Sequence, residues 1–192
     1  QDAAGTSNLY HGYFIGVGPG FTCLVDRIDF SSETISAPGN NVPYQGTYFM
    51  AFSGGKSVNS KGVRKGSDKD GKGISSTYGY FVGGFAPPNV CTIDRIDFSS
   101  ETVAVPPVGD QLTQATRRLA AVSNSNYGYF AGGNVSGNVT TINRIDFSSE
   151  TVVGPPTHGA NLTQARLNLG AVSSPDYGYF AAGNAPPFVN TI

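Results

Sequence analysis

The sequence predicts an all-β protein made of repeated four-stranded antiparallel units, arranged as the blades of a β-propeller. The string YGYF, with one variant HGYF, recurs at 11–14, 78–81, 127–130 and 177–180. A second string, RIDFSSET, recurs at 27–34, 95–102 and 144–151. The stretches between the Gly, Asn and Pro turn signals are short and carry many β-branched and aromatic residues, as strands do. Four short strands that repeat about every 49 residues are typical of a propeller blade.

The expected strands follow in order within one complete unit. The sequence LAAVS (119–123) leads through a turn into YGYFAG (127–132), and a Gly- and Asn-containing loop leads to TINRIDF (141–147). The residues SSE then turn the chain into TVVG (151–154). We expect these four stretches to pair as antiparallel neighbours, and the segment 155–168, which is rich in turn formers, to connect one unit to the next.

The repeats divide residues 1–192 into one repeat domain. Its units run over about 1–48, 49–118, 119–168 and a partial 169–192, and the second unit contains an insertion within 54–77. Closed propellers have about 4 to 8 blades. We therefore expect the three and a half units to be a segment of a longer propeller. A small ring, or a ring completed by a second chain, is the alternative.

The unit resembles a kelch repeat of the galactose-oxidase-like kind. The resemblance rests on an apolar strand that ends in a glycine pair (Gly83 and Gly84, Gly132 and Gly133), the aromatic in DFSSET, the Pro-Pro segment and the Arg before the next unit. The chain departs from that pattern because it has no Trp and because the glycine pair is lost in its first and last units. The sequences YGYF, RIDFSSET and LTQAR are also similar to repeats in tail-fibre-like structural proteins of marine bacteriophages. This second resemblance implies a virion or extracellular location.

Composition excludes several classes of partner. The chain has 12 Lys and Arg against 13 Asp and Glu, and only 13% of its residues are charged. Binding of nucleic acid through a basic surface is therefore not expected. Membrane insertion is not expected either, since no window approaches about 18 consecutive apolar residues.

Charged residues present in every copy are expected to be structural. The Arg and the Asp of RID lie two apart in a strand and so share one face. These residues are Arg27, Arg95 and Arg144 with Asp29, Asp97 and Asp146. We expect Arg95 and Arg144 to be buried and paired with carboxylates, most simply Asp97, Asp146 or their counterparts in the adjacent unit, because a buried charge needs a partner. An arginine array that binds an anion is the alternative.

The sequence offers little catalytic chemistry. There are two histidines, and His11 takes the place of a Tyr of the other copies. Cys23 and Cys91 occupy equivalent places in two units, beyond the roughly 7 Å Cα separation that a disulfide allows, so free thiols are expected. No Tyr, His and Cys cluster matches the copper site of galactose oxidase. We therefore expect no enzyme and no cofactor; an oxidoreductase of that type is the least favoured alternative.

The insertion carries a weak calcium candidate and a basic charge. Asp68 and Asp70 have the spacing of first and third ligands of a calcium loop, but Lys72 and Gly79 stand where further ligands belong. Its excess of Lys and Arg predicts a solvated loop or a contact to an acidic glycan or subunit. Sequons at Asn134, Asn138 and Asn161 would carry glycans only in a secreted eukaryotic protein.

Loops that differ between units are the expected place of function. The loop after the YGYF strand reads GPGF, FAPPN, NVSGN and NAPPF in the four units. Together with the unit connection, it supplies the candidate ligand-binding residues Phe21, Phe85, Asn134, Asn138, His158 and Phe188. Aromatic rings beside amides suit a sugar, although turn-forming residues are the plainer interpretation. The expected function is non-catalytic binding or adhesion to a surface carbohydrate or receptor protein. A purely structural unit that contacts other copies or virion subunits is the alternative.

Overall fold

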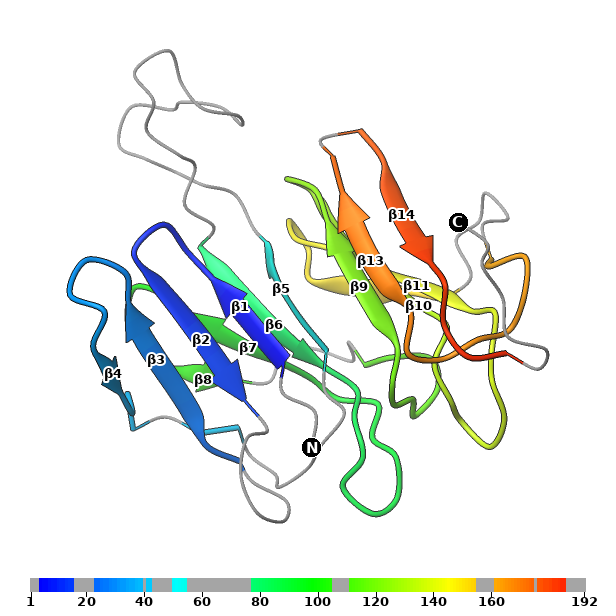
Figure 1. Cartoon of the computed structure of the whole chain (residues 1–192), viewed down its shortest axis with the longest axis horizontal. Coiled ribbons are helices and arrows are strands. Elements are labelled where there is room, and N and C mark those ends of the chain that lie inside the picture. Colours follow the sequence, from blue (N-terminus) through cyan, green and yellow to red (C-terminus); the bar gives the residue numbers. More distant parts are fainter. Residues whose placement is uncertain are drawn as a thin grey trace.

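The protein is all-β in the residues that the structure describes. The computed structural model describes residues 4–15, 23–39, 41–42, 50–54, 77–104, 111–154, 161–174 and 176–185. These residues form fourteen strands in four antiparallel sheets and contain no helix (Figure 1). Accordingly, the described part of the chain has no helix that could span a membrane.

Each complete unit forms one four-stranded meander. The first sheet contains β1 (Ala4–Ser7), β2 (His11–Ile15), β3 (Val25–Asp29) and β4 (Ile35–Ser36). The second sheet contains β5 (Met50–Gly54), β6 (Tyr78–Val82), β7 (Ile93–Asp97) and β8 (Val103–Ala104). The third sheet contains β9 (Ala120–Ser123), β10 (Tyr127–Ala131), β11 (Ile142–Asp146) and β12 (Thr151–Val153). The fourth sheet contains β13 (Gly170–Ser173) and β14 (Gly178–Ala181). The predicted antiparallel order is confirmed, and no predicted strand end differs from the structure by more than one residue.

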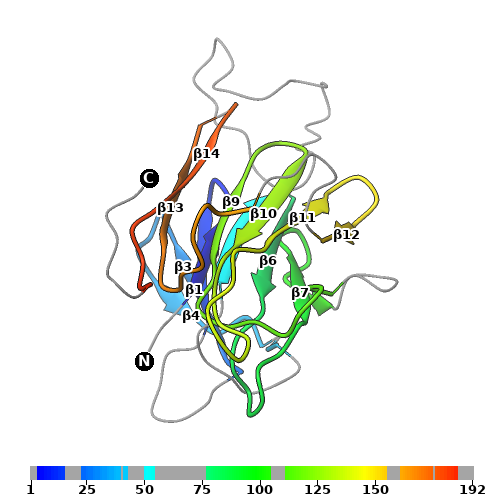
Figure 2. The ribbon, with the colours of Figure 1, turned by 90° about the vertical axis from the view of Figure 1, so that its right-hand side faces the viewer.

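Consecutive sheets pack face to face because the strands alternate in period two. One apolar cluster joins the first and second sheets, a second cluster joins the second and third, and a third cluster joins the third and fourth. The first strands of the four sheets, β1, β5, β9 and β13, contact one another in that order. Figure 2 shows β13 and β14 beside β9 in the view turned by 90°.

The glycine of YGYF is required by this close packing. A Cβ atom on Gly79 would lie 2.5 Å from Cγ2 of Thr6 in the preceding sheet, and one on Gly128 would lie 2.5 Å from Cε2 of Phe52. Real Cβ atoms do not approach other atoms so closely. The repeated glycine therefore lets the first strand of one sheet lie against the second strand of the next.

The closed ring of a propeller is not established by these sheets. None of the four sheets closes on itself in the described residues, and every strand pair among them is antiparallel. The established fold is therefore an array of open antiparallel sheets.

Candidate functional site

The RIDFSSET segment forms the same turn in all three complete units. In the second unit, Oδ1 of Asp97 accepts hydrogen bonds from the Ser99 backbone N–H at 2.7 Å and the Ser99 hydroxyl at 2.6 Å. Burial alone would raise the pKa of Asp97, but these bonds outweigh it and leave the pKa below its usual range. The equivalent Asp29 and Asp146 bind their own serines in the same way. The repeated aspartate thus holds its own turn.

In the second and third units, the glutamate of this turn reaches into the preceding unit. Glu101 accepts a hydrogen bond from the Tyr13 hydroxyl at 3.0 Å, and its Oε1 lies 2.5 Å from Nη1 of Arg27. Glu150 accepts from the Tyr80 hydroxyl at 3.2 Å and forms an ion pair with Arg95. Burial, with smaller contributions from the carboxylate, raises the pKa of Tyr80 above its usual range. One contact, made of Tyr, Arg and Glu, therefore recurs between successive units.

These contacts correct the expected partner of the arginines. A carboxylate does pair with Arg95, but it is Glu150 of the next unit and not Asp97 or Asp146. The reason is that Asp97 ends its strand and turns its carboxylate to the serines that follow. Arg144 has no carboxylate partner in the described residues; its guanidinium lies over the Tyr127 ring, 4.5 Å from the centroid.

The glutamate has an unusual backbone conformation in every copy. The φ angles of Glu33, Glu101 and Glu150 are 56°, 57° and 55°, in the left-handed region that costs a residue with a side chain about 1 to 2 kcal/mol. Glycine would avoid this cost. For Glu101 and Glu150, the contact of the side chain with the preceding unit offsets the backbone cost.

Three residues of the predicted loop site lie in the described part of the chain. The Arg117 guanidinium lies over the Phe85 ring, with its Cζ atom 4.9 Å from the ring centroid. Asn134 accepts, through its backbone carbonyl, a hydrogen bond of 3.0 Å from the Asn89 side chain. Asn138 repeats this contact one unit later by donating to the Asn184 carbonyl at 2.8 Å. These loops are therefore joined from unit to unit by an asparagine amide.

The other predicted site residues lie outside the residues that the structure describes. These are Phe21, His158 and Phe188, together with the calcium candidates Asp68 and Asp70. Across the described ranges, no three His, Cys, Asp or Glu side chains form a group that could hold a metal ion. Cys23 and Cys91 are both free thiols.

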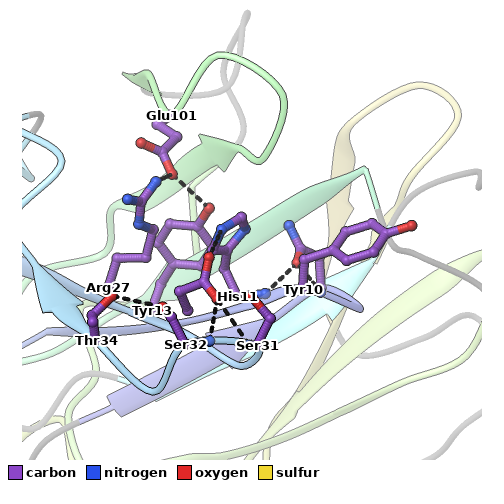
Figure 3. Close-up of polar contacts among 10 residues, drawn as sticks. Tyr10, His11, Tyr13, Arg27, Ser31, Ser32, Thr34 and Glu101 are labelled. Carbon is purple, nitrogen blue, oxygen red and sulfur yellow. Dashed lines mark hydrogen bonds and ion pairs between the residues drawn. The ribbon is translucent and has the colours of Figure 1, made fainter.

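A pocket of about 450 Å³ lies at one end of the first sheet, between the β1–β2 and β3–β4 turns. Its residues are Leu9, Tyr10, His11, Asp29, Phe30 and Ser31. Figure 3 shows His11 and Tyr10 beside Ser31 and Ser32 of the turn after β3. Nε2 of His11 lies 3.4 Å from Oδ2 of Asp29. The rings of Tyr10 and Phe30 are 64% and 49% exposed. Apolar rings and a polar pair thus face solvent together.

The sequence did not predict this pocket. His11 was interpreted only as a replacement of tyrosine, but the signal that indicates the pocket is that His11 and its neighbours differ from the other copies. The third unit has Ser125, Asn126 and Tyr127 where the first has Leu9, Tyr10 and His11. Three successive residues specific to one unit therefore gather at one exposed pocket.

Comparison with models of known protein families gives no match, and comparison with curated proteins gives none.

Proposed function

We propose that the chain is a non-catalytic binding module that recognises a carbohydrate or cell-surface receptor, as part of a virion fibre or extracellular assembly. In this proposal the units follow one another as blades of a kelch-like propeller. The antiparallel four-stranded sheets and the contacts between their first strands support that arrangement.

The observation that carries the proposal is that shared residues and unit-specific residues lie in different places. Residues shared by the copies, such as Arg95 and Glu150, are used between units. Residues found in one unit, such as Tyr10 and His11, lie at the exposed pocket. An exposed aromatic ring covers the apolar C–H face of a sugar, while the His11 and Asp29 pair can meet hydroxyl groups.

The test exchanges the pocket residues for those of another unit. The protein is applied to a glycan array, and the affinity for the best glycan is then measured for the parent and for the variant Leu9→Ser, Tyr10→Asn and His11→Tyr. This variant carries the residues of the third unit, which support the same turn, so the fold is expected to persist. We expect at least a tenfold loss of affinity, about 1.4 kcal/mol.

Ile35→Ser is the matched control, because Ile35 is 74% exposed in the same sheet and does not line the pocket. It should leave both binding and melting temperature unchanged. Equal binding by the parent and the exchanged variant, with equal melting temperatures, would refute the assignment of this pocket.

A second candidate function, a structural unit that assembles with other subunits, is favoured by the exposed face of the first sheet. Phe14 and Phe30 are 44% and 49% exposed, whereas their equivalents Phe81 and Phe147 are 0% and 7% exposed between sheets. An apolar face that is covered in each inner unit suits a further subunit. Sedimentation of the parent should then show association that Phe14→Ser with Phe30→Ser abolishes. A parent that stays monomeric at high concentration would count against assembly of this chain with itself.

A further inference from the structure

The contact between the second and third units shows which side chains of one unit bind the face of the unit before it. Phe147 stacks on Tyr80 with ring centroids 5.4 Å apart and on Phe52 with centroids 5.9 Å apart. Three residues later, Glu150 binds Tyr80 and Arg95. The segment Phe-Ser-Ser-Glu therefore supplies one aromatic ring and one carboxylate. Phe98 and Glu101 repeat this contact on Tyr13 and Arg27.

The third sheet presents the receiving half of this contact. Arg144 and Tyr129 are the equivalents of Arg95 and Tyr80. Tyr80 is fully buried, but Tyr129 is only half-buried. Arg144 stacks on Tyr127 as Arg95 stacks on Tyr78, so its side chain already has the position of the paired arginine. Neither Arg144 nor Tyr129 contacts a carboxylate among the described residues.

A cavity lies where the phenylalanine of such a segment belongs. The residues that hold Phe147, namely Phe52 and Tyr80, correspond to Val122 and Tyr129 in the third sheet. Both Val122 and Tyr129 line a cavity of about 280 Å³. Gly178 and Phe180 of β14 form another part of its wall. The wall is mostly apolar, although Ser123, Asn124, Ser173, Ser174 and Asp176 also line it. Arg144 lies in the same sheet as Val122 and Tyr129 but does not line the cavity.

A strand edge that no described strand pairs with adjoins this cavity. In each complete sheet the second strand pairs on both sides, with the first strand and with the RID strand. β14, the second strand of the fourth sheet, pairs only with β13 among the described strands. An unpaired edge takes up another strand through its backbone N–H and C=O groups.

We propose that the edge of β14, the cavity and Arg144 form an acceptor site for a β-hairpin of the RIDFSSE type, supplied by a further repeat unit. The hairpin adds its first strand to β14, places its phenylalanine in the cavity and pairs its glutamate with Arg144 and Tyr129. The charges are complementary, since the hairpin brings one carboxylate to a guanidinium that forms no ion pair with any carboxylate of the described residues. A second whole copy docked by its first sheet does not fit, because its own β1 and β2 would need the place that β13 and β14 occupy.

The register of the added strand follows from the inner sheets. In the third sheet Gly128 lies opposite Ile145 and Tyr129 lies opposite Arg144. The same register sets Gly178 opposite the second isoleucine of the incoming hairpin and Tyr179 opposite its arginine. This site is separate from the pocket at the first sheet and goes beyond the proposed ligand-binding function.

The experiment uses a peptide with the sequence of residues 141–154, TINRIDFSSETVVG, as the probe. A fluorescently labelled peptide is titrated with the complete 192-residue protein, and binding is followed by anisotropy. We expect saturable binding. Replacing the peptide's glutamate by glutamine (E150Q) or its phenylalanine by alanine (F147A) should weaken binding about tenfold or more, because each removes one half of the contact. Peptide variants carry no risk of misfolding the protein.

The protein variant R144Q tests whether the peptide's glutamate pairs with Arg144. It should bind the parent peptide and the E150Q peptide equally weakly, because the carboxylate then has no cation to meet. Hydrogen exchange should show more amides of residues 177–181 protected with the peptide than in the free chain, where only the amides that bond to β13 are protected. Absence of saturable binding, equal binding of all peptides, or exchange protection of 177–181 by a second copy before peptide is added would each overturn the proposal.

Discussion

The ion pair between successive units gives the sharpest prediction for stability. The substitution Glu150→Ala removes the carboxylate that binds the Tyr80 hydroxyl and Arg95. Tyr80 is fully buried, and an unsatisfied buried hydroxyl costs about 1 to 3 kcal/mol. The side chains of Arg95 and Glu150 are 21% and 12% exposed, so their pair should contribute less than the 3 to 5 kcal/mol lost from fully buried pairs, about 1 to 2 kcal/mol. We expect a total loss of about 3 kcal/mol in the free energy of unfolding.

The matched control is Glu33→Ala. Glu33 has the same left-handed backbone, and its carboxylate has no partner in the described residues. Both variants therefore pay the same backbone cost, and only one loses a contact between units. Urea unfolding followed by far-ultraviolet circular dichroism and tyrosine fluorescence measures both, because the chain has no Trp. Glu33→Ala should change stability by less than about 0.5 kcal/mol.

Two results would refute this reasoning. The first is a Glu150→Ala variant no less stable than Glu33→Ala. The second concerns Arg95→Met in the Glu150→Ala background, which removes the stranded guanidinium and should recover part of the loss. A double variant less stable than Glu150→Ala by the full cost of a second deletion would show that the two residues do not act as a pair.

Three further predictions test the packing, the turns and the loops. Gly128→Ala should cost about 1 to 3 kcal/mol because its Cβ would lie 2.5 Å from the buried Phe52 ring. Gly12→Ala should cost less because its Cβ would lie 3.0 Å from Ile28 and 3.2 Å from the exposed Phe30; equal losses in urea unfolding would contradict this. Asp146→Asn keeps an acceptor oxygen for Ser148 but cannot be protonated in acid. Because the folded pKa of Asp146 is lowered, chiefly by the Ser148 hydroxyl, its contribution is present above the unfolded pKa of about 3.9 and is lost as pH falls through the folded value. The parent's melting temperature should therefore fall more than the variant's below about pH 4; parallel pH profiles would oppose this role. Asn138→Ala should cost about 1 kcal/mol through the lost bond to the Asn184 carbonyl, and an unchanged melting temperature would argue that the amide serves a ligand instead.

The repeats explain why the strands could be predicted from the sequence. Turn signals recur at the same offsets in each copy, and the strands expected over 119–123, 127–132, 141–147 and 151–154 correspond to β9, β10, β11 and β12. Comparison of the copies also separated shared residues from unit-specific ones.

The partner of Arg95 could not be predicted in the same way. Spacing within one strand indicates only which side chains share a face, and it favoured Asp97. The real partner lies 55 residues away in the chain, on a turn of the next unit, and is selected by how the two sheets pack. Likewise, the pocket at His11 exists because its rings lie on an outer face of the array, which a pattern of residues does not reveal.

The left-handed glutamate gives the array a direction. The second and third units each reach backward with a carboxylate to a tyrosine and an arginine of the unit before, so the joint between two units is made of unlike halves. Such joints can be extended one unit at a time without changing the unit itself, and they cannot be formed head to head. Gain or loss of a whole repeat by recombination would carry both halves along and leave a working joint. The number of units is therefore a quantity that evolution can alter in single steps, at little cost to the interfaces that remain.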